Sequence, residues 1–513
     1  MTDSNSMEIK YFLGIKKRVV FDGFIVGLFA GIVAVLYRHI LSLATKLSDY
    51  IYLNANTILD YMGTFLLILL LGSIVAYLIK KVPLASGSGI PQVQGEIYGL
   101  YNMNPLSLIA AKFTGGIMAN IAGLSLGREG PSIQLGAACG KLLAKILKRD
   151  EDEEQMMISA GTGAGLAAAF NAPISGVLFT VEELHKNITP VFLISAMIAS
   201  VVADYISKHA FGMNAVFSFH VDKTIPLKYY AYIVILGLFT GLGGVIFNRV
   251  LLKVQSIYKG LKIKSVYHPI IAFLIAGILG FSFRHITGGG HELMENIVHK
   301  AIDDNGFIIL IIVSKLLFTS ICYGSKAIGG IFLPVLVLGG LMGVVSFNIL
   351  DQFALLDSNY LVNFVILAMA GYLTGVVRSP LLSVMLVAEM TGTFVHVLSL
   401  CIVSVTAYLT CELFKTEPIY ESLLKVLIDT EGINKNISSK YKKVLAVFKL
   451  SEDSYLVGEE ISNVEFPHHA LLVSIERNNE RIVPTAETKL EAYDKIIFAS
   501  DHEGIFELQE FFE

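Results

Sequence analysis

The sequence SLGREGPSIQ occupies residues 125–134, inside a long stretch of small and apolar residues. Two charged residues, Arg128 and Glu129, stand between its glycines, and Pro131 opens a further apolar run. Proline is favoured in the first turn of a helix, so the pattern places Glu129 at or just before a helix N-terminus. The unpaired backbone N–H groups and the positive end of the helix dipole favour an anion at that position. The stretch therefore predicts a helix that begins at a carboxylate inside an apolar body.

The composition indicates a membrane protein joined to a soluble tail. Of the 513 residues, 54% are hydrophobic and 16% are charged, and the mean hydropathy is +0.65. This apolar content is typical of a protein that crosses the membrane several times. Residues 421–513 carry 10 basic and 18 acidic residues, whereas residues 1–420 carry 29 and 25. We therefore expect the C-terminal part to be a soluble, acidic module.

The apolar segments of the membrane body are irregular in length. Long runs occupy roughly residues 23–47, 63–80, 228–253, 267–284 and 394–414. Shorter pieces, broken by Gly, Pro or polar residues, occupy residues 105–124, 131–147, 156–170, 173–184, 330–349 and 380–391. Helices that stop partway across a bilayer leave backbone groups unpaired, and these are tolerated only where they line a cavity or a site. Broken helices at matching places in two halves point to a transport site.

Two patterns recur in the same order in the two halves. P-x3-L-G-x3-G begins at Pro131 and again at Pro334, an offset of 203 residues. A proline followed nine residues later by glutamate occurs as Pro173 with Glu182 and as Pro380 with Glu389. The second offset is 207 residues, so the two halves stay in register. We infer an internal repeat, whose orientation these residues leave open.

The cysteines and the N-terminus give further expectations. Cys139, Cys322, Cys401 and Cys411 lie in apolar segments at no metal-ligand spacing, so we expect neither a metal site nor a disulfide framework. The polar N-terminus has no signal-peptide pattern. Basic residues 16–18 precede the first apolar run, which predicts a cytoplasmic N-terminus.

Glu129 has two interpretations. It could simply cap its helix, but Ser or Asp at the membrane edge would do so at lower cost, and an intramembrane ionisable group is functional by default. In the functional interpretation, its carboxylate occupies a site that a free anion could also occupy. Once protonated it would leave, so that one group couples the movement of an anion to that of a proton.

The sequence SGSGIPQV, residues 86–93, predicts a flexible loop that leads into another helix. Backbone N–H groups and the Ser88 hydroxyl are donors suited to an anion, and no acidic residue is present to repel it. The alternative is a tight helix–helix crossing, where Gly and Ser let two backbones approach. In the second half, GGIFLP at residues 329–334 stands where GREGP stands in the first, with Ile331 and Phe332 near the position of the charged pair.

Two further groups could serve a polar site. Glu182 and Glu183 are adjacent in an apolar run, and neighbouring helix positions point about 100° apart, so one could face the bundle interior and relay protons. Alternatively, both lie at a helix end in the water layer. Tyr420 follows the last apolar run, where tyrosine usually anchors the chain at the interface, although its hydroxyl could point inward as a donor.

These stretches together resemble the CLC family of chloride channels and chloride/proton antiporters. The family's signature triplet reads here as GSGIP (87–91), GREGP (127–131) and GIFLP (330–334), and the resemblance spans about residues 10–425. It implies an all-α polytopic membrane protein with two inverted repeats of broken, tilted helices. It also implies a homodimer in the plasma membrane, with one pore per subunit and with both termini in the cytoplasm. Chloride and protons are the implied substrates, and neither a nucleic-acid partner nor a bound metal is expected.

The resemblance also implies roles for single residues. Glu129 matches the gating glutamate, and Glu183 matches the inner proton glutamate that antiporters generally carry and many channels replace. Side-chain hydroxyls of Ser88 and Tyr420 and backbone N–H groups of Ile331 and Phe332 would bind the central anion. A serine at position 88 resembles the chloride-preferring rather than the nitrate-preferring branch. Supporting positions are Gly87, Gly89, Arg128 and Gly130.

The tail predicts a separate domain. We expect a transport domain over residues 1–427, a linker over 428–443 and a small α/β regulatory domain over 444–513. Strand-like runs occupy residues 470–477, 481–488 and 494–501. The tail resembles the RCK_C (TrkA-C) domain, which dimerises and in some bacteria binds cyclic di-AMP, although no diagnostic ligand motif is present.

The leading functional hypothesis is therefore exchange of chloride for protons through Glu129 and Glu183. A passive voltage- or ligand-gated chloride channel is the nearest alternative, and it would move anions without coupled protons. A membrane signalling protein with the tail as its output would bind a ligand without ion flux. An enzyme is not expected, because the sequence has no G-x-S-x-G, H-E-x-x-H or P-loop pattern.

Overall fold

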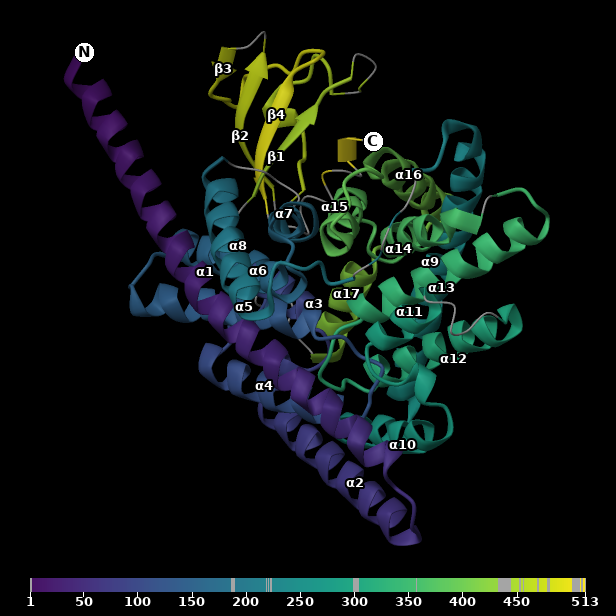
Figure 1. Ribbon diagram of the computed structural model, residues 1–513. Coiled ribbons are helices and arrows are strands. Elements are labelled where there is room, and N and C mark those ends of the chain that lie inside the picture. Colours follow the sequence, from purple (N-terminus) through teal and green to yellow (C-terminus); the bar gives the residue numbers. More distant parts are fainter. Residues whose placement is uncertain are drawn as a thin grey trace. The chain divides into compact units, whose positions relative to one another are not determined.

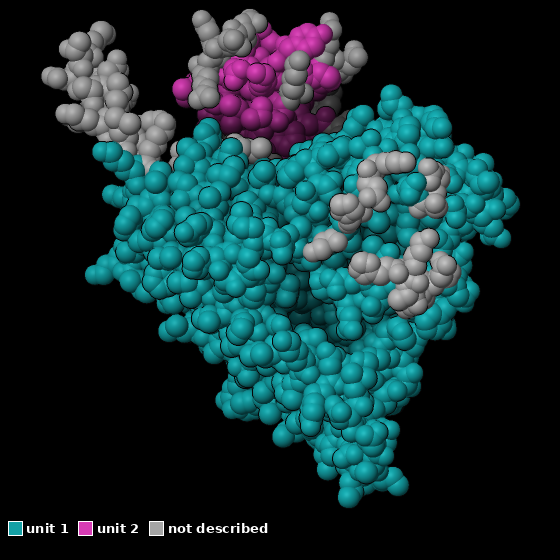
Figure 2. All heavy atoms as spheres, viewed as in Figure 1, with its two compact units in different colours: residues 1–97, 101–428 teal, residues 98–100, 429–513 magenta. Residues whose placement is uncertain are grey.

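A computed structural model gives the fold of the chain (Figure 1). It describes residues 2–185, 190–217, 219, 221, 224–298, 304–356, 358–431, 444–451, 454, 456–467, 470–477, 480–500, 508 and 511–512. The chain divides into two compact units, coloured separately in Figure 2. Residues 1–97 and 101–428 form the first unit, and residues 98–100 and 429–513 form the second. Most of the expected linker, residues 432–443, lies outside the described residues.

The first unit is built from helices. In the described ranges they are α1 (Thr2–Leu53), α2 (Ile58–Lys81), α3 (Ile90–Ile97), α4 (Pro105–Ile121), α5 (Glu129–Ile146), α6 (Glu151–Phe170), α7 (Pro173–Leu178), α8 (Pro190–Phe211), α9 (Tyr230–Gly260), α10 (His268–Ser282), α11 (His291–Val298), α12 (Asn305–Gly324), α13 (Phe332–Gln352), α14 (Leu361–Val377), α15 (Pro380–Thr391), α16 (Val397–Leu413) and α17 (Ile419–Glu431). Among the described residues, six helices are long and apolar enough to cross a membrane: α1, α2, α9, α10, α12 and α13.

The helix boundaries follow the sequence pattern closely, with some differences. Proline occupies the first turn of α4, α7, α10 and α15. An N–H group in the first turn has no acceptor within the helix, so proline, which lacks this group, loses no hydrogen bond there. Residues 330–349, expected as a short piece, correspond to α13, which is long enough to span a membrane. Residues 394–414, expected as a long run, correspond to α16, which has only 17 residues. The spanning helix α12 was not among the expected long runs.

The pattern of helix–helix packing in the first half recurs in the second half, eight helices later. In the first half α5 packs on α6, α1 on α8, and α6 on α8; in the second half α13 packs on α14, α9 on α16, and α14 on α16. The same pairs therefore recur when eight is added to each helix number. Helices α2 and α10 pack on each other across the halves, as do α7 and α15. The inferred repeat is thus present in the fold.

Contacts between the halves are reciprocal. The N–H of Gly127 donates to the carbonyl of Gly330 at 2.7 Å, and the N–H of Gly330 donates back to Gly127 at 2.7 Å, in an antiparallel bridge. Reciprocal contacts between equivalent residues are the mark of a two-fold axis. Since the two segments run antiparallel at the bridge, the halves are inverted relative to each other.

A second reciprocal contact joins α7 and α15. The Glu182 carboxylate accepts the backbone N–H groups of Leu381 and Leu382 at 3.2 and 2.7 Å. The Glu389 carboxylate accepts those of Ile174 and Ser175 at 3.0 and 2.8 Å. Each half therefore supplies the acidic cap for the first turn of a short helix in the other half, where unpaired N–H groups favour a carboxylate. The Pro-x8-Glu pattern found in both halves has this physical basis.

Replacement of Glu389 by alanine is expected to destabilise the fold. The carboxylate also accepts the Ser175 hydroxyl at 2.5 Å, so the change leaves three donors without an acceptor. An unpaired donor costs about 1–3 kcal/mol when it is fully buried, and the part-buried Ser175 donors and the exposed Ile174 N–H should each cost less than that. The apparent melting temperature of the detergent-solubilised protein should fall accordingly. Glu151→Ala, at an exposed first-turn carboxylate of α6, is the matched control. Equal shifts for both variants would contradict the assigned capping role.

Two buried lysines fix equivalent loops. Lys112 donates to the carbonyls of Ala85 and Gly87 at 3.0 and 2.8 Å. Lys315, 203 residues later, donates to those of Ile286 and Gly288 at 3.3 and 3.1 Å. An ammonium group in an apolar body requires acceptors, and these carbonyls provide them. The loop that carries Ser88 is thereby held in one conformation.

The second unit contains a four-stranded antiparallel sheet with the strand order β1-β4-β2-β3. Its strands are β1 (Val444–Lys449), β2 (Ala470–Arg477), β3 (Glu480–Ile482) and β4 (Lys495–Ser500). The predicted strands at 470–477 and 494–501 correspond to β2 and β4, although residue 501 lies outside the described residues. The run 481–488 is a strand only at its start, because Pro484 follows and cannot donate to a ladder. Strand β1 was not among the predicted runs.

A buried ion pair organises this unit. The Asp494 carboxylate is fully buried and accepts Nε and Nη2 of Arg477 at 2.8 and 2.9 Å. The same carboxylate accepts the backbone N–H of Glu491 at 2.9 Å. The hydrogen bond to Asp494 and the charges of Asp494 and Glu491 raise the pKa of Arg477. The apolar core beneath is formed around Ile475, Ile496 and Phe498.

Candidate functional site

The candidate site lies where two helices begin next to each other. Glu129 is the first residue of α5, and Phe332 is the first residue of α13. The bridge between Gly127 and Gly330 lies directly before both starts and holds them together. A Cβ on Gly330 would lie 2.9 Å from the backbone nitrogen of Gly130, so this approach requires glycine. The unpaired N–H groups of two helix starts therefore meet in one place, which is an environment that favours an anion.

The Glu129 carboxylate occupies this environment without a conventional partner. The residue is only 1% exposed, and among the described residues neither carboxylate oxygen makes a hydrogen bond of normal geometry. Its nearest counter-charge is the Arg128 guanidinium, with 3.9 Å between Arg128 Nε and Glu129 Oε1. The carboxylate also interacts with the backbone N–H groups of Glu129 itself and of Leu333, which belong to the first turns of α5 and α13. It therefore faces the starts of both helices, whereas Glu182 and Glu389 each cap a single helix.

The loop before α3 brings Ser88 into the same region. Gly87 and Gly89 have φ angles of 60° and 93°, which L side chains rarely adopt, so the loop depends on glycine at both places. Ser88 is fully buried, and its Oγ accepts the backbone N–H of Ile90 at 3.3 Å. The same Oγ lies 3.2 Å from the hydroxyl of Tyr323, in the last turn of α12.

The aromatic side of the site is formed by Phe332 and Tyr420. Their rings stack with centroids 6.0 Å apart, and Tyr420 is fully buried near the start of α17. The Tyr420 hydroxyl makes no hydrogen bond within the described residues. Tyr420 interacts electrostatically with Tyr323, Glu183 and Glu129. Tyr420 is therefore not an interface anchor, because its hydroxyl lies inside the protein and is unpaired.

Glu182 and Glu183 have different environments, as their adjacent positions predict. They lie in a π-helical turn, Phe179–His185, that follows α7. Glu182 caps α15, whereas Glu183 is 4% exposed. Gln94 Nε2 donates to Glu183 Oε1 at 3.2 Å, and Ser379 Oγ donates to Glu183 Oε2 at 2.8 Å. Glu183 is thus the member of the pair that faces the interior.

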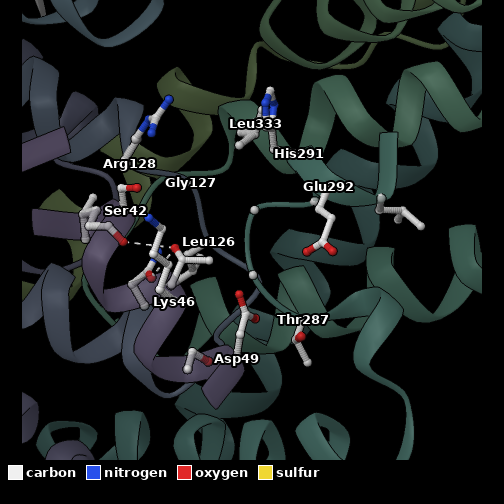
Figure 3. A pocket seen from close by; sticks show the side chains of 18 of the residues that line it. Ser42, Lys46, Asp49, Leu126, Gly127, Arg128, Thr287, His291, Glu292 and Leu333 are labelled. Carbon is white, nitrogen blue, oxygen red and sulfur yellow. Dashed lines mark hydrogen bonds between the residues drawn. The ribbon is translucent and has the colours of Figure 1, made fainter. Parts of the chain in front are cut away.

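Glu129 is part of the lining of a cavity of about 510 Å³. Figure 3 shows this cavity from close by, with Arg128, His291 and Glu292 among its labelled lining residues. Its charged lining includes Lys46 and Asp49 from α1, Arg128 and Glu129 at the start of α5, and His291 and Glu292 at the start of α11. Side chains of both signs of charge therefore line the cavity. Among the described residues, no group of three or more His, Cys, Asp or Glu side chains could hold a metal ion.

Three residues of the site were not predicted from the sequence. Tyr323, Gln94 and Ser379 contact predicted site residues, but none of the three was itself proposed as a site residue. The repeat was a usable signal only for Ser379, because it precedes Pro380. The contacts of Tyr323 and Gln94 depend on how distant segments pack.

The family model described as "Voltage gated chloride channel" matches residues 71–412. The chain belongs to the CLC family. This CLC protein is 30% identical over 417 residues to the H(+)/Cl(-) exchange transporter ClcA of Vibrio cholerae serotype O1 (strain M66-2), covering 79% of this chain and 89% of the relative. It is 29% identical over 419 residues to ClcA of Salmonella schwarzengrund (strain CVM19633), covering 79% and 88% of the two chains.

Solved structures show the same fold. The crystal structure of a slow cyanobacterial Cl-/H+ antiporter superposes with a TM-score of 0.75 at 29% identity, covering 81% of this chain and 99% of that one. A CLC-type fluoride/proton antiporter has a TM-score of 0.68 at 21% identity, covering 79% and 97%. These relatives are ion exchangers and not enzymes. The CLC protein is accordingly a multi-pass membrane protein.

The C-terminal tail matches a second family model. The model of the TrkA-C domain matches residues 445–513, a range that contains the four-stranded sheet except for Val444, the first residue of β1. The CLC body thus carries a TrkA-C domain at its C-terminal end.

Proposed function

We propose that this CLC protein is a secondary active transporter that exchanges chloride for protons, gated by Glu129. The observation that carries the proposal is the buried Glu129 carboxylate, without a hydrogen-bond partner of normal geometry in the described chain, between the starts of α5 and α13. A transported anion needs the same environment, so carboxylate and chloride compete for it. The names of the ClcA relatives and of the cyanobacterial antiporter support exchange.

The central chloride would be bound by four residues. Backbone N–H groups of Ile331 and Phe332 lie at the start of α13, and hydroxyls of Ser88 and Tyr420 add side-chain donors. All four residues are buried, so their donors act in a low dielectric, where each hydrogen bond to an anion is strong. Serine at position 88 favours chloride over nitrate in this proposal, as in the family branch that it resembles.

The proton would pass through Glu183 to Glu129. Glu183 accepts donors from two other helices, and this fixes the direction of its carboxylate. When Glu129 takes up the proton, its side chain becomes neutral and loses its electrostatic attraction to the N–H groups. It then leaves the site, and the anion enters. One proton is thereby coupled to the movement of anions in the opposite direction.

The deciding experiment uses purified protein in liposomes with a chloride gradient and a pH-sensitive dye. An antiporter drives protons uphill when chloride runs down its gradient. A passive channel moves chloride and leaves the pH unchanged, and that result would overturn the proposal.

We further propose that the protein is a homodimer in the plasma membrane with both termini in the cytoplasm. Basic residues at 16–18 support the orientation of the N-terminus. Size-exclusion chromatography with light scattering tests the dimer, and labelling of cysteines introduced into the tail tests its side of the membrane.

The TrkA-C domain is proposed to regulate transport, with cyclic di-AMP as the candidate ligand. The support is the resemblance of the tail to domains that bind it. Calorimetry with cyclic di-AMP and the full-length protein tests binding, and liposome flux with and without the nucleotide tests regulation. Absence of binding would leave dimer stabilisation as the role of the domain.

A further inference from the structure

The Tyr323 hydroxyl lies inside the proposed anion site but has no role in the proposed exchange. Tyr323 ends α12 in the second half of the chain, and Ser88 lies in a loop of the first half, 235 residues away in sequence. Their hydroxyl oxygens are 3.2 Å apart, and the residues are 5% and 0% exposed. The Tyr323 oxygen also lies against Gly87, where a Cβ would be only 3.5 Å away. The ring therefore ends directly on the Ser88 loop.

The hydrogen-bond capacity of Ser88 decides what this contact does. A serine hydroxyl has one proton to donate and two lone pairs that accept. One lone pair of Ser88 Oγ accepts the N–H of Ile90 at 3.3 Å. If Tyr323 donates its phenolic proton to the other, the Ser88 proton has no acceptor among the described residues and is directed at a ligand. The reverse arrangement would use the Ser88 proton inside the protein and remove it from the site.

The chemistry of the two hydroxyls favours the first arrangement. A phenol is a stronger acid than an aliphatic alcohol and therefore a better donor. An anion accepts hydrogen bonds and donates none, so its binding also favours the state in which Ser88 donates to it. The Tyr420 hydroxyl, with no partner among the described residues, supplies a second proton to the same region.

We propose that Tyr323 is a positioning residue of the anion site: it donates to Ser88 Oγ and thereby turns the Ser88 proton toward the bound halide. The inference rests on the proposed function, because it assumes that Ser88 binds the transported anion. It adds a residue that the family signature does not contain and that acts through Ser88 rather than by touching the anion. It also predicts that the site selects anions partly through the orientation of one hydroxyl.

The test is chloride binding to the detergent-solubilised full-length protein, measured by isothermal titration calorimetry. Tyr323→Phe keeps the ring and removes only the hydroxyl, and we expect chloride affinity to fall about 5-fold, the effect of losing one neutral hydrogen bond. Tyr372→Phe, which removes another fully buried hydroxyl from α14, is the matched control and should leave affinity unchanged.

A double-mutant cycle separates positioning from simple packing. In a Ser88→Ala background Tyr323→Phe should have no further effect on affinity, because the group through which it acts is gone. Additive losses in the double variant, or unchanged affinity in Tyr323→Phe, would overturn the inference. The ratio of nitrate to chloride affinity should rise in Tyr323→Phe, whereas loss of packing would weaken both anions equally.

Failure of the proposed exchange can be distinguished from failure of the Tyr323 inference. Wild-type protein that binds chloride but moves no protons in liposomes would refute antiport and leave the binding cycle valid. Wild-type protein that binds no chloride would overturn both.

Discussion

Glu129→Gln is expected to preserve chloride flux and to abolish coupled proton movement. Glutamine has the size of a protonated glutamate and carries no charge, so it no longer competes with chloride for the N–H groups at the starts of α5 and α13. It also has no proton to release at neutral pH. Proton flux driven by a chloride gradient should fall by at least about tenfold, which corresponds to about 1.4 kcal/mol in the barrier.

The measurement records both ions in the same liposomes, chloride by electrode and protons by dye. Glu292→Gln is the matched control, because Glu292 is an exposed carboxylate in the lining of the same cavity. The substitution changes the charge of the cavity but leaves the Glu129 carboxylate between the starts of α5 and α13 intact. Coupling of proton flux to chloride flux should therefore persist. Coupled proton movement in Glu129→Gln would sink the gating mechanism.

Glu183→Gln is expected to reduce proton flux much more than chloride flux. The amide keeps an oxygen toward the Ser379 hydroxyl, and its NH2 can donate to Gln94 Oε1 once the Gln94 amide turns over. The shape of the side chain is thus preserved while the titratable group is lost. If Glu183 carries the proton, its flux should fall by at least about tenfold, whereas chloride still reaches the central site.

The neighbouring glutamate offers the comparison. Glu182→Gln retains an acceptor oxygen for the backbone N–H of Leu382, so it should keep coupling and lose some stability. Equal losses of chloride and proton flux in Glu183→Gln would show that the residue is structural. Loss of coupling in Glu182→Gln but not in Glu183→Gln would exchange the two roles.

The local pattern predicts most helix starts because they depend on near neighbours. Proline in the first turn restricts the backbone within a few residues, so α4, α5, α7 and α15 begin close to the predicted positions. Strand β1 shows the limit of this reasoning. It exists through its pairing with β4, about 50 residues later, and its own sequence carries no turn signal that marks it.

The two motif glutamates show the same contrast. The Pro-x8-Glu pattern identified Glu182 and Glu389 as equivalent, but it did not reveal that each caps the other half's helix. That contact requires α7 and α15 to pack together. Helix periodicity alone allowed either Glu182 or Glu183 to face the interior, the family resemblance pointed to Glu183, and the packing places Glu183 there.

The sequence by itself determined the membrane character of the body, the internal repeat, the acidic tail and the group of residues around Glu129. Each of these follows from composition or from spacing along one segment. The tertiary structure decided the inversion of the halves, the different environments of Glu182 and Glu183, and the contact of Tyr323 with Ser88. These depend on which side chains meet across segments 89 to 235 residues apart in the sequence. Such meetings are set by the packing of whole helices, which no local pattern encodes.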